Sequence, residues 1–280
     1  MNYNYYIFFL LLILVFFIIS RPSQKLEAFQ AKTVVCLMCV CPNDIVLSFA
    51  KKISKSYSVY IVCDDIYCTT SEESYATFIK ISDEEVTRAN YTKSNVAISK
   101  IPSAWDKALY YFCVKDISPS HVWFIEEDVF VPRVSILKEM DEKYPEADLI
   151  AKQNVEHKDD PDFIWWHDAE GTLNEPLYRS LVCATRLSRA LLTKISQFVK
   201  QHRRLVFIEI MFNTLVAENN MSLAMPDELS TIIWRHNWNE NAVDQDHIYH
   251  PVKDLNEQKK YRTKLSKQPY SKVEAFRGQN

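Results

Sequence analysis

Three consecutive acids, Glu126, Glu127 and Asp128, interrupt an otherwise apolar stretch of the chain. Residues 121–125 before them are mostly apolar or aromatic, and residues 129–132 after them are apolar again. This pattern predicts a buried strand whose carboxyl end opens at a crevice, where open α/β sheets bind ligands. Because side chains alternate along a strand, we expect Glu126 and Asp128 to point one way and Glu127 the other, unless the backbone turns there. Two carboxylates on one side suit a hard divalent cation that binds phosphates, although a solvated loop after a core strand has the same composition.

A fourth acid, Glu209, lies inside the apolar run 205–212. An unpartnered charge is costly there, so its carboxylate must be paired, hydrogen-bonded or placed at the mouth of a cavity. Two interpretations stay open, a general base at a cavity and an ion pair at the edge of the core. The candidate partners for such an ion pair are Arg186, Arg189 and Arg235.

The residues around these acids alternate between strand-like and helix-like patterns. The expected strands cover residues 33–40, 58–63, 75–81, 121–125 and 148–151, and the expected helices cover 45–54, 103–112, 134–143 and 181–199. This βαβ opening predicts a mostly parallel sheet with right-handed crossovers, flanked by helices. The second strand ends at Asp64 and Asp65, where a ligand contact and an ordinary turn are equally compatible with the sequence.

The composition limits the class of protein. A chain of 280 residues that is 48% hydrophobic can bury a full core, and we expect one catalytic domain over residues 31–253. A net charge of −3 gives no basic surface for nucleic acid. With only two glycines, the chain has neither the dinucleotide fingerprint nor a Walker loop. A bound phosphate must therefore be held by a metal, by side chains or by a helix N-terminus.

The first part of the chain has the composition of a membrane anchor. Residues 3–19 are almost wholly apolar, at the lower limit of length for crossing a bilayer, and no small-residue cleavage site follows them. We expect a transmembrane anchor over residues 1–20 and a short stem over 21–30, with a buried core helix as the alternative.

Two features disagree about the orientation of this anchor. Arg21 and Lys25 follow the apolar run, and the positive-inside rule then favours a cytoplasmic body. The glycosylation sequons at Asn90 and Asn220 favour a lumenal body, in the ER or the Golgi, and this is the orientation that we expect.

The seven cysteines do not describe a disulfide scaffold, because their number is odd and they cluster inside apolar runs. We expect most of them to be buried thiols. Cys36, Cys39 and Cys41 are spaced like half of a metal motif, but a buried strand explains them as well. Residues 254–280 are charged and nearly free of aliphatic side chains, which predicts a tail that wraps the surface or lacks fixed structure.

The triplet and its surroundings resemble the GT-A superfamily of nucleotide-sugar glycosyltransferases, most closely the N-acetylglucosaminyltransferase I family. In that family an apolar strand ends in an acidic triplet followed by further apolar residues, as residues 124–132 do here. The catalytic acid of the family follows an aromatic residue further along the chain, as Glu209 follows Phe207. A Pro-Glu-Ile-Ser-like stretch comes next and matches residues 226–230, although Glu209 stands where the family has aspartate. The resemblance covers residues 31–235.

The resemblance implies a GT-A-like fold and a membrane-anchored enzyme that moves a sugar, with N-acetylglucosamine as one candidate, from a UDP-sugar to a hydroxyl group of a glycan or glycoprotein, with inversion. It implies a Mn²⁺ or Mg²⁺ ion held by Asp128, with Glu126, Glu127 and His250 around it. It implies Glu209 as the catalytic base, with Asp227 and Glu228 in reserve. The residues implied for the nucleotide sugar are Asp64, Asp65, Lys107 and Lys253, and the aromatic platforms for sugar or acceptor are Trp165, Trp166, Trp234 and Trp238.

Two other classes fit parts of the pattern. A glycoside hydrolase also needs paired carboxylates across a sugar, but it needs neither a metal triplet nor a nucleotide-type βαβ opening. A non-catalytic relative could bind a sugar or nucleotide on the tryptophan platforms alone.

Overall fold

The computed structural model describes residues 32–69, 73–97 and 100–268. Contacts within the chain separate the residues up to Lys32 from a unit that begins at Thr33, and the elements below belong to this second unit. The predicted anchor and stem, residues 1–30, lie outside the described residues, as do residues 269–280 of the predicted tail. Within the described ranges, no helix has both the length and the apolar character needed to cross a membrane.

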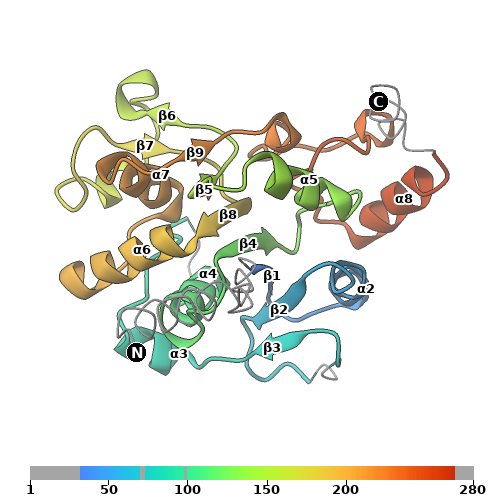
Figure 1. Ribbon diagram of the computed structural model, residues 1–280, viewed down its shortest axis with the longest axis horizontal. Helices are drawn as coiled ribbons and strands as arrows, with labels where there is room; N and C mark the ends of the chain where they lie inside the picture. Colours follow the sequence, from blue (N-terminus) through green and yellow to red (C-terminus); the bar gives the residue numbers. More distant parts are fainter. Residues whose placement is uncertain (1–31, 70–72, 98–99, 269–280) are drawn as a thin grey trace, which may run out of the picture. The chain divides into compact units, whose positions relative to one another are not determined.

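A seven-stranded sheet in the order β3-β2-β1-β4-β8-β5-β9 forms the centre of this unit (Figure 1). Its strands are β1 (Thr33–Cys39), β2 (Ser58–Cys63), β3 (Thr77–Ile79), β4 (His121–Glu126), β5 (Leu149–Ile150), β8 (Ala184–Ser188) and β9 (Leu223–Ala224). Strand β1 runs parallel to β2 on one side and to β4 on the other, whereas β8 is antiparallel to β4 and β5. The predicted α/β class, with a mixed and mostly parallel sheet flanked by helices, is confirmed. A separate two-stranded sheet pairs β6 (Val155–Glu156) with β7 (Tyr178–Arg179).

Three of the four expected helices form where the spacing of apolar residues predicts them, whereas the helices over residues 83–88, 208–218 and 255–265 were not predicted. The helices are α2 (Asp44–Ile53), α3 (Asp83–Arg88), α4 (Ala104–Tyr110), α5 (Ser135–Lys143), α6 (Arg189–His202), α7 (Ile208–Glu218) and α8 (Leu255–Leu265). Short helical turns are η1 (Tyr111–Lys115), η2 (His157–Asp159), η3 (Trp166–Asp168), η4 (Asp227–Leu229) and η5 (Glu240–Ala242). Helix α2 begins after Asn43, whose side chain accepts hydrogen bonds from two backbone N–H groups of the first turn.

The two faces of the sheet are buried by different helices. Val34 and Cys36 of β1 belong to a core that α4, α6 and α7 complete, and Val35 and Leu37 belong to a core that α2 and α5 complete. Alternate residues of one strand thus pack in opposite directions, which is why β1 is a continuous apolar run. A smaller cluster joins Phe130 to the segments that precede and form α8.

The expected helix over residues 181–199 is wrong in its first part. Residues Ala184–Ser188 form strand β8, and helix α6 starts only at Arg189, where the side chain of Ser188 caps it. All five residues of β8 are buried. A strand buried on both faces has no alternation of polar and apolar residues, so its sequence looks like that of a buried helix.

Two further features were not predicted. Cys41 and Cys68 form a disulfide that joins the loop after β1 to the loop after β2, while the other five cysteines are buried thiols, as expected. Residues Leu255–Leu265 of the charged tail form helix α8, which buries Gln258, Tyr261 and Leu265. Three buried side chains are too few to produce a helical signal in a segment dominated by charge.

Candidate active site

The acidic triplet lies where the strand order of the sheet reverses. The chain leaves β1 through α2 toward β2, and it returns through α3 and α4 to add β4 on the other side of β1. The carboxyl ends of β1 and β4 are neighbours, because Met38 pairs with Glu126 in the parallel ladder. Such a reversal leaves a crevice at the ends of the strands, where ligands bind in open α/β sheets.

Strand β4 ends at Glu126, and Glu127 and Asp128 form a turn after it, so the alternation expected for a strand does not apply to them. The Oε1 atom of Glu126 accepts a hydrogen bond of 2.6 Å from the indole N–H of Trp105. The Oε1 atom of Glu127 accepts a hydrogen bond of 3.5 Å from the backbone N–H of Val40. All three acids line the first cavity described below, and only Glu126 and Asp128 also line the second.

His250 faces this pair of acids from a segment far along the chain. Its Nε2 atom lies 3.6 Å from the Oδ2 atom of Asp128 and 4.0 Å from the Oε2 atom of Glu126. Its Nδ1 atom lies 3.0 Å from the carbonyl oxygen of Ile233. When the backbone carbonyl accepts the Nδ1 proton, Nε2 is left to face the acids, and histidines that bind metals are commonly held in this way.

The backbone fixes the segment that carries His250 beside the triplet. The N–H group of Val252 donates to the carbonyl of Asp128 at 2.7 Å, and Phe130 forms an antiparallel bridge with Tyr249. The side chain of Gln258, in α8, donates to the carbonyl of Glu127 at 3.1 Å. The charged tail thus supports the site that the sequence places in the middle of the chain.

Cys183 is a member of the cluster that sequence reasoning missed. Ligand atoms of Glu126, Cys183 and His250 all lie within 4.8 Å of one another, which is close enough to hold one metal ion. Cys183 reaches this place because it precedes the antiparallel strand β8, whose start lies beside the end of β4. The sequence would have indicated Cys183 only if residues 184–188 had been predicted as a strand.

The carboxylates and the imidazole of the cluster shift one another's pKa values. Burial raises the pKa of Glu126, and the neighbouring carboxylate of Asp128 raises it further. Burial also raises the pKa of Glu127. Burial alone would lower the pKa of His250, but Asp128 and Glu126 outweigh it and hold that pKa above its usual value. The site concentrates negative charge that a bound cation would neutralise.

Two cavities meet at these acids. The first has a volume of about 560 Å³ and lies over the ends of β1 and β2, where Val40, Asp64 and Trp105 line it. The second has a volume of about 580 Å³ and lies toward α7, where Glu209 and Trp234 line it. Both cavities are lined by Asn95, Glu126, Asp128 and Lys253. Glu126 and Asp128 therefore lie at the boundary between the two cavities.

Glu209 lies in the first turn of α7 and faces the second cavity. It is only 9% exposed, and the described residues include no ion-pair partner for its carboxylate. Burial, followed by the charge of Glu126, raises the pKa of Glu209 to about 8, although Arg179 and His250 act in the opposite direction. A carboxyl group with such a pKa can take up a proton near neutral pH.

The ion-pair interpretation of Glu209 has no support among the described contacts. Arg186 forms its ion pair with Asp141 at 2.6 Å. Arg189 donates to backbone carbonyls, and Arg235 lies over an aromatic ring.

The residues expected at the nucleotide sugar separate into different environments. Asp64 lines the first cavity, and Lys253 lines both cavities. Lys107 is fully buried instead and pairs with Asp64 at 3.1 Å and with Asp83 at 2.7 Å, so it acts behind the cavity wall. Asp65 is exposed and accepts a hydrogen bond from a backbone N–H group two residues later, as in an ordinary turn.

Of the four tryptophans expected as platforms, Trp234 lines the second cavity. Trp165 and Trp166 pack against the core around η3, and Trp238 packs against Tyr249. None of these three lines either cavity.

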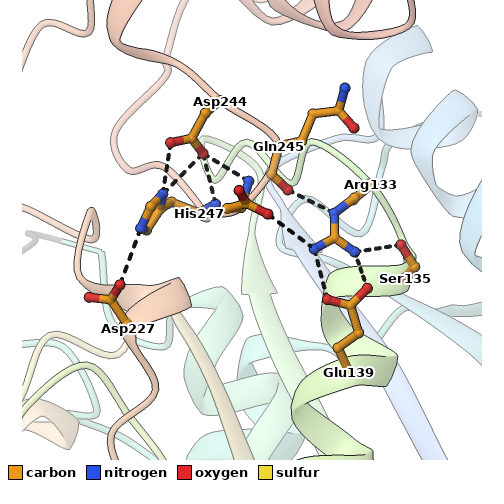
Figure 2. A network of polar contacts seen from close by, with 8 residues as sticks. Arg133, Ser135, Glu139, Asp227, Asp244, Gln245 and His247 are labelled. Atoms are coloured by element: carbon orange, nitrogen blue, oxygen red, sulfur yellow. Dashed lines mark hydrogen bonds and ion pairs between the residues drawn. The ribbon is translucent and has the colours of Figure 1, made fainter. Parts of the chain in front are cut away.

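The reserve acids lie in η4, outside the linings of both cavities. Figure 2 shows Asp227 beside His247, at 3.5 Å, within a network that also includes Asp244. The same view shows Arg133 bound to Glu139, on α5. This network joins the loop before His250 to the body of the protein.

Comparisons with known proteins give similarity at the level of the overall structure. No family model and no curated protein sequence matches the chain. An active-site mutant of LgtC is similar over 84% of this chain and 98% of its own, with 11% sequence identity and a TM-score of 0.47. The apo form of mouse xyloside xylosyltransferase 1 is similar over 70% of this chain and 85% of its own, with 10% identity and a TM-score of 0.39. The functional assignment below therefore rests on the geometry of the site.

Proposed function

We propose that this chain is a glycosyltransferase of the GT-A kind, which moves a sugar from a UDP-sugar to a hydroxyl acceptor with the help of a divalent cation. The observation that carries the proposal is the placement of His250 opposite Glu126 and Asp128, at the strand reversal and between two cavities. The resemblance of the triplet to the N-acetylglucosaminyltransferase I family extends the proposal to UDP-N-acetylglucosamine as the donor.

The residues at the boundary fit a hard cation. Carboxylate oxygens suit Mn²⁺, and the carbonyl of Ile233 orients the imidazole of His250 as an additional ligand. Asp128 and His250 would hold the ion, with Glu126 beside them. When bound, the ion supplies Lewis-acid stabilisation of the departing diphosphate. Lys253, which lines both cavities, would add positive charge near the same phosphates.

The first cavity is then the nucleotide compartment. Asp64 lies at the end of β2, with its carboxylate 2.7 Å from Lys100 and 3.1 Å from Lys107. The backbone and side-chain oxygens at this strand end offer acceptors for the N–H and O–H groups of uracil and ribose. The buried Lys107 fixes the orientation of Asp64 from behind.

The second cavity is then the acceptor compartment. An inverting transfer needs a base that removes the proton of the acceptor hydroxyl on the face opposite the leaving diphosphate. Glu209 lies in this cavity, and its carboxylate can take that proton. Trp234, which is 57% exposed, offers an apolar face to a sugar ring.

The test is UDP binding by titration calorimetry, with and without Mn²⁺. We expect tight binding only with Mn²⁺, and Asp128→Asn should lose the Mn²⁺ dependence while the protein stays folded, because the change removes one anionic ligand and no packing. Asp162→Asn, a matched change at an exposed acid outside both cavities, should behave as the wild type. Unchanged Mn²⁺-dependent affinity in Asp128→Asn would contradict the assignment.

Measurements of turnover distinguish a glycosyltransferase from the other two classes of protein. A non-catalytic relative would bind UDP with Mn²⁺ but transfer no sugar, and a glycoside hydrolase would cleave a glycoside without any need for UDP or Mn²⁺. A screen of nucleotide sugars for transfer and hydrolysis, with and without Mn²⁺, distinguishes all three outcomes.

A further inference from the structure

Cys183 gives the cation cluster a ligand that a hard metal does not use. Cys183 is 7% exposed and lines the second cavity. Its sulfur lies within 4.8 Å of ligand atoms of both Glu126 and His250. Cys183 does not line the first cavity. Its sulfur therefore lies on the side of the cluster that faces the second cavity, the proposed acceptor compartment.

The cluster therefore contains two overlapping sets of ligands. Asp128, which lines both cavities, and His250, which lines the second, offer an oxygen and a nitrogen that lie 3.6 Å apart. Glu126, Cys183 and His250 offer an oxygen, a sulfur and a nitrogen. Three protein ligands of this mixed kind, with a fourth position open to a cavity, are typical of tetrahedral zinc, whereas Mn²⁺ prefers oxygen ligands.

We propose that Glu126, Cys183 and His250 form a second, sulfur-containing cation site that takes Zn²⁺ or Co²⁺. When such an ion binds, the S–H bond of Cys183 breaks, the proton leaves to the buffer, and a metal–sulfur bond forms in its place. No oxidant or reductant is needed. Because His250 belongs to both sets, occupation of this site excludes Mn²⁺ from the other.

The site itself does not depend on the proposed glycosyltransferase activity, but its competition with Mn²⁺ does. Imidazole and thiolate ligands bind Zn²⁺ more tightly than Mn²⁺ in general. A small excess of Zn²⁺ should therefore displace Mn²⁺ and abolish Mn²⁺-dependent UDP binding.

The direct test uses Co²⁺, which gives a thiolate-to-metal charge-transfer band in the near ultraviolet. The wild-type protein should develop this band during titration, and Zn²⁺ should remove it. Cys183→Ser and Cys183→Ala should both lack the band, and His250→Asn should weaken Co²⁺ binding at least tenfold. Circular dichroism establishes that each variant is folded.

A matched control addresses the other thiols. Cys63 is a buried free thiol that lies opposite Cys39 in the parallel ladder, and this pair is the alternative source of sulfur ligands. Cys63→Ser should keep the Co²⁺ band. A wild-type protein without the band, a band that survives in Cys183→Ser, or a band lost in Cys63→Ser would each overturn the proposal.

The two proposals fail in different ways. A Co²⁺ band without Mn²⁺-dependent UDP binding would leave the sulfur-containing site in place and remove the glycosyltransferase assignment. Mn²⁺-dependent UDP binding without the Co²⁺ band would do the reverse. Asp128→Asn separates the sites within one protein, because it should weaken Mn²⁺-dependent UDP binding and keep the Co²⁺ band.

Discussion

Glu209 is the residue whose role the structure changes most. The sequence left an ion pair and a general base equally open, and the described contacts supply no ion-pair partner. Under our proposal Glu209→Gln should keep Mn²⁺-dependent UDP binding and lower kcat by about 10²–10⁴-fold. Rate measurements with the donor identified by the nucleotide-sugar screen test this. Normal turnover of this variant, together with an inactive Asp227→Asn, would move the base elsewhere.

The same residue predicts an effect on stability. The pKa of Glu209 is raised from 4.5 to about 8 in the folded protein, so its contribution to stability is fully present below pH 4.5 and is lost as the pH rises through 8. The amide of glutamine has no proton to lose in this pH range and stays uncharged. Glu209→Gln should therefore gain stability over the wild type as the pH rises from 5 to above 8, by at most about 4 kcal/mol.

Thermal unfolding at several pH values, without added metal, measures this gain. Glu142→Gln, at an exposed position on α5, is the control and should show no such trend. A Glu209→Gln protein that is less stable at every pH would indicate that the carboxylate is a structural ion-pair partner.

Trp105 is expected to position Glu126 without touching the cation. Its indole N–H donates to Glu126 at 2.6 Å, while its ring packs against Phe124 and Phe212. Trp105→Phe keeps an aromatic ring in place and removes the donor. We expect the affinity for Mn²⁺ to fall by about 10–100-fold, the usual effect of losing an outer partner of a metal ligand. Calorimetry with Mn²⁺ and UDP tests this, and Trp166→Phe, away from both cavities, should leave the affinity unchanged.

At the scale of elements, the disulfide between Cys41 and Cys68 links the loops that follow β1 and β2. It closes a loop with a sequence separation of 27 residues. Chain-entropy arguments then predict that the double variant Cys41→Ser, Cys68→Ser loses about 3–4 kcal/mol of unfolding free energy. Denaturant unfolding of the oxidised protein and of the variant measures the difference. Equal midpoints would show that the cross-link contributes nothing to stability.

The elements also show what the sequence can and cannot predict. The opening β1, α2 and β2 and the central strand β4 follow from local patterns, because each has its own apolar period and its own turn residues. Strand β8 does not, since burial on both faces removes the alternation that identifies a strand.

The residues of the candidate site also differ in whether a local sequence pattern predicts them. The triplet lies at the end of one strand and in the turn that follows it, and it is visible as a local pattern. Cys183 joins it only through the antiparallel pairing of β8, and His250 only through bridges formed by the segment before α8. The disulfide likewise depends on β1 and β2 being neighbours. Contacts between distant segments of this kind leave no local trace in composition or spacing.

At the scale of the whole molecule, the disulfide bears on the compartment. Disulfides persist in oxidising compartments and are rare in the cytosol. Together with the two sequons, this supports our proposal that an N-terminal anchor places the catalytic domain in the lumen of the ER or Golgi, against the orientation that the flanking charges favour.

N-glycosylation tests that orientation. Asn220 is exposed after α7, whereas Asn90 is half-buried after α3, so we expect Asn220 to be the more completely modified site. Protein made in a eukaryotic cell should gain mobility after removal of N-glycans, and Asn220→Gln should lose most of that shift. Ser222→Ala, which removes the same sequon and keeps Asn220, is the matched control. Protease access to the body in sealed microsomes would contradict the lumenal orientation.

The boundary shared by the two cavities has a kinetic consequence. Until a divalent cation neutralises Glu126 and Asp128, these carboxylates repel the negatively charged diphosphate of a nucleotide. Under our proposal the cation and the nucleotide sugar should therefore add in a compulsory order, with the cation first or both together.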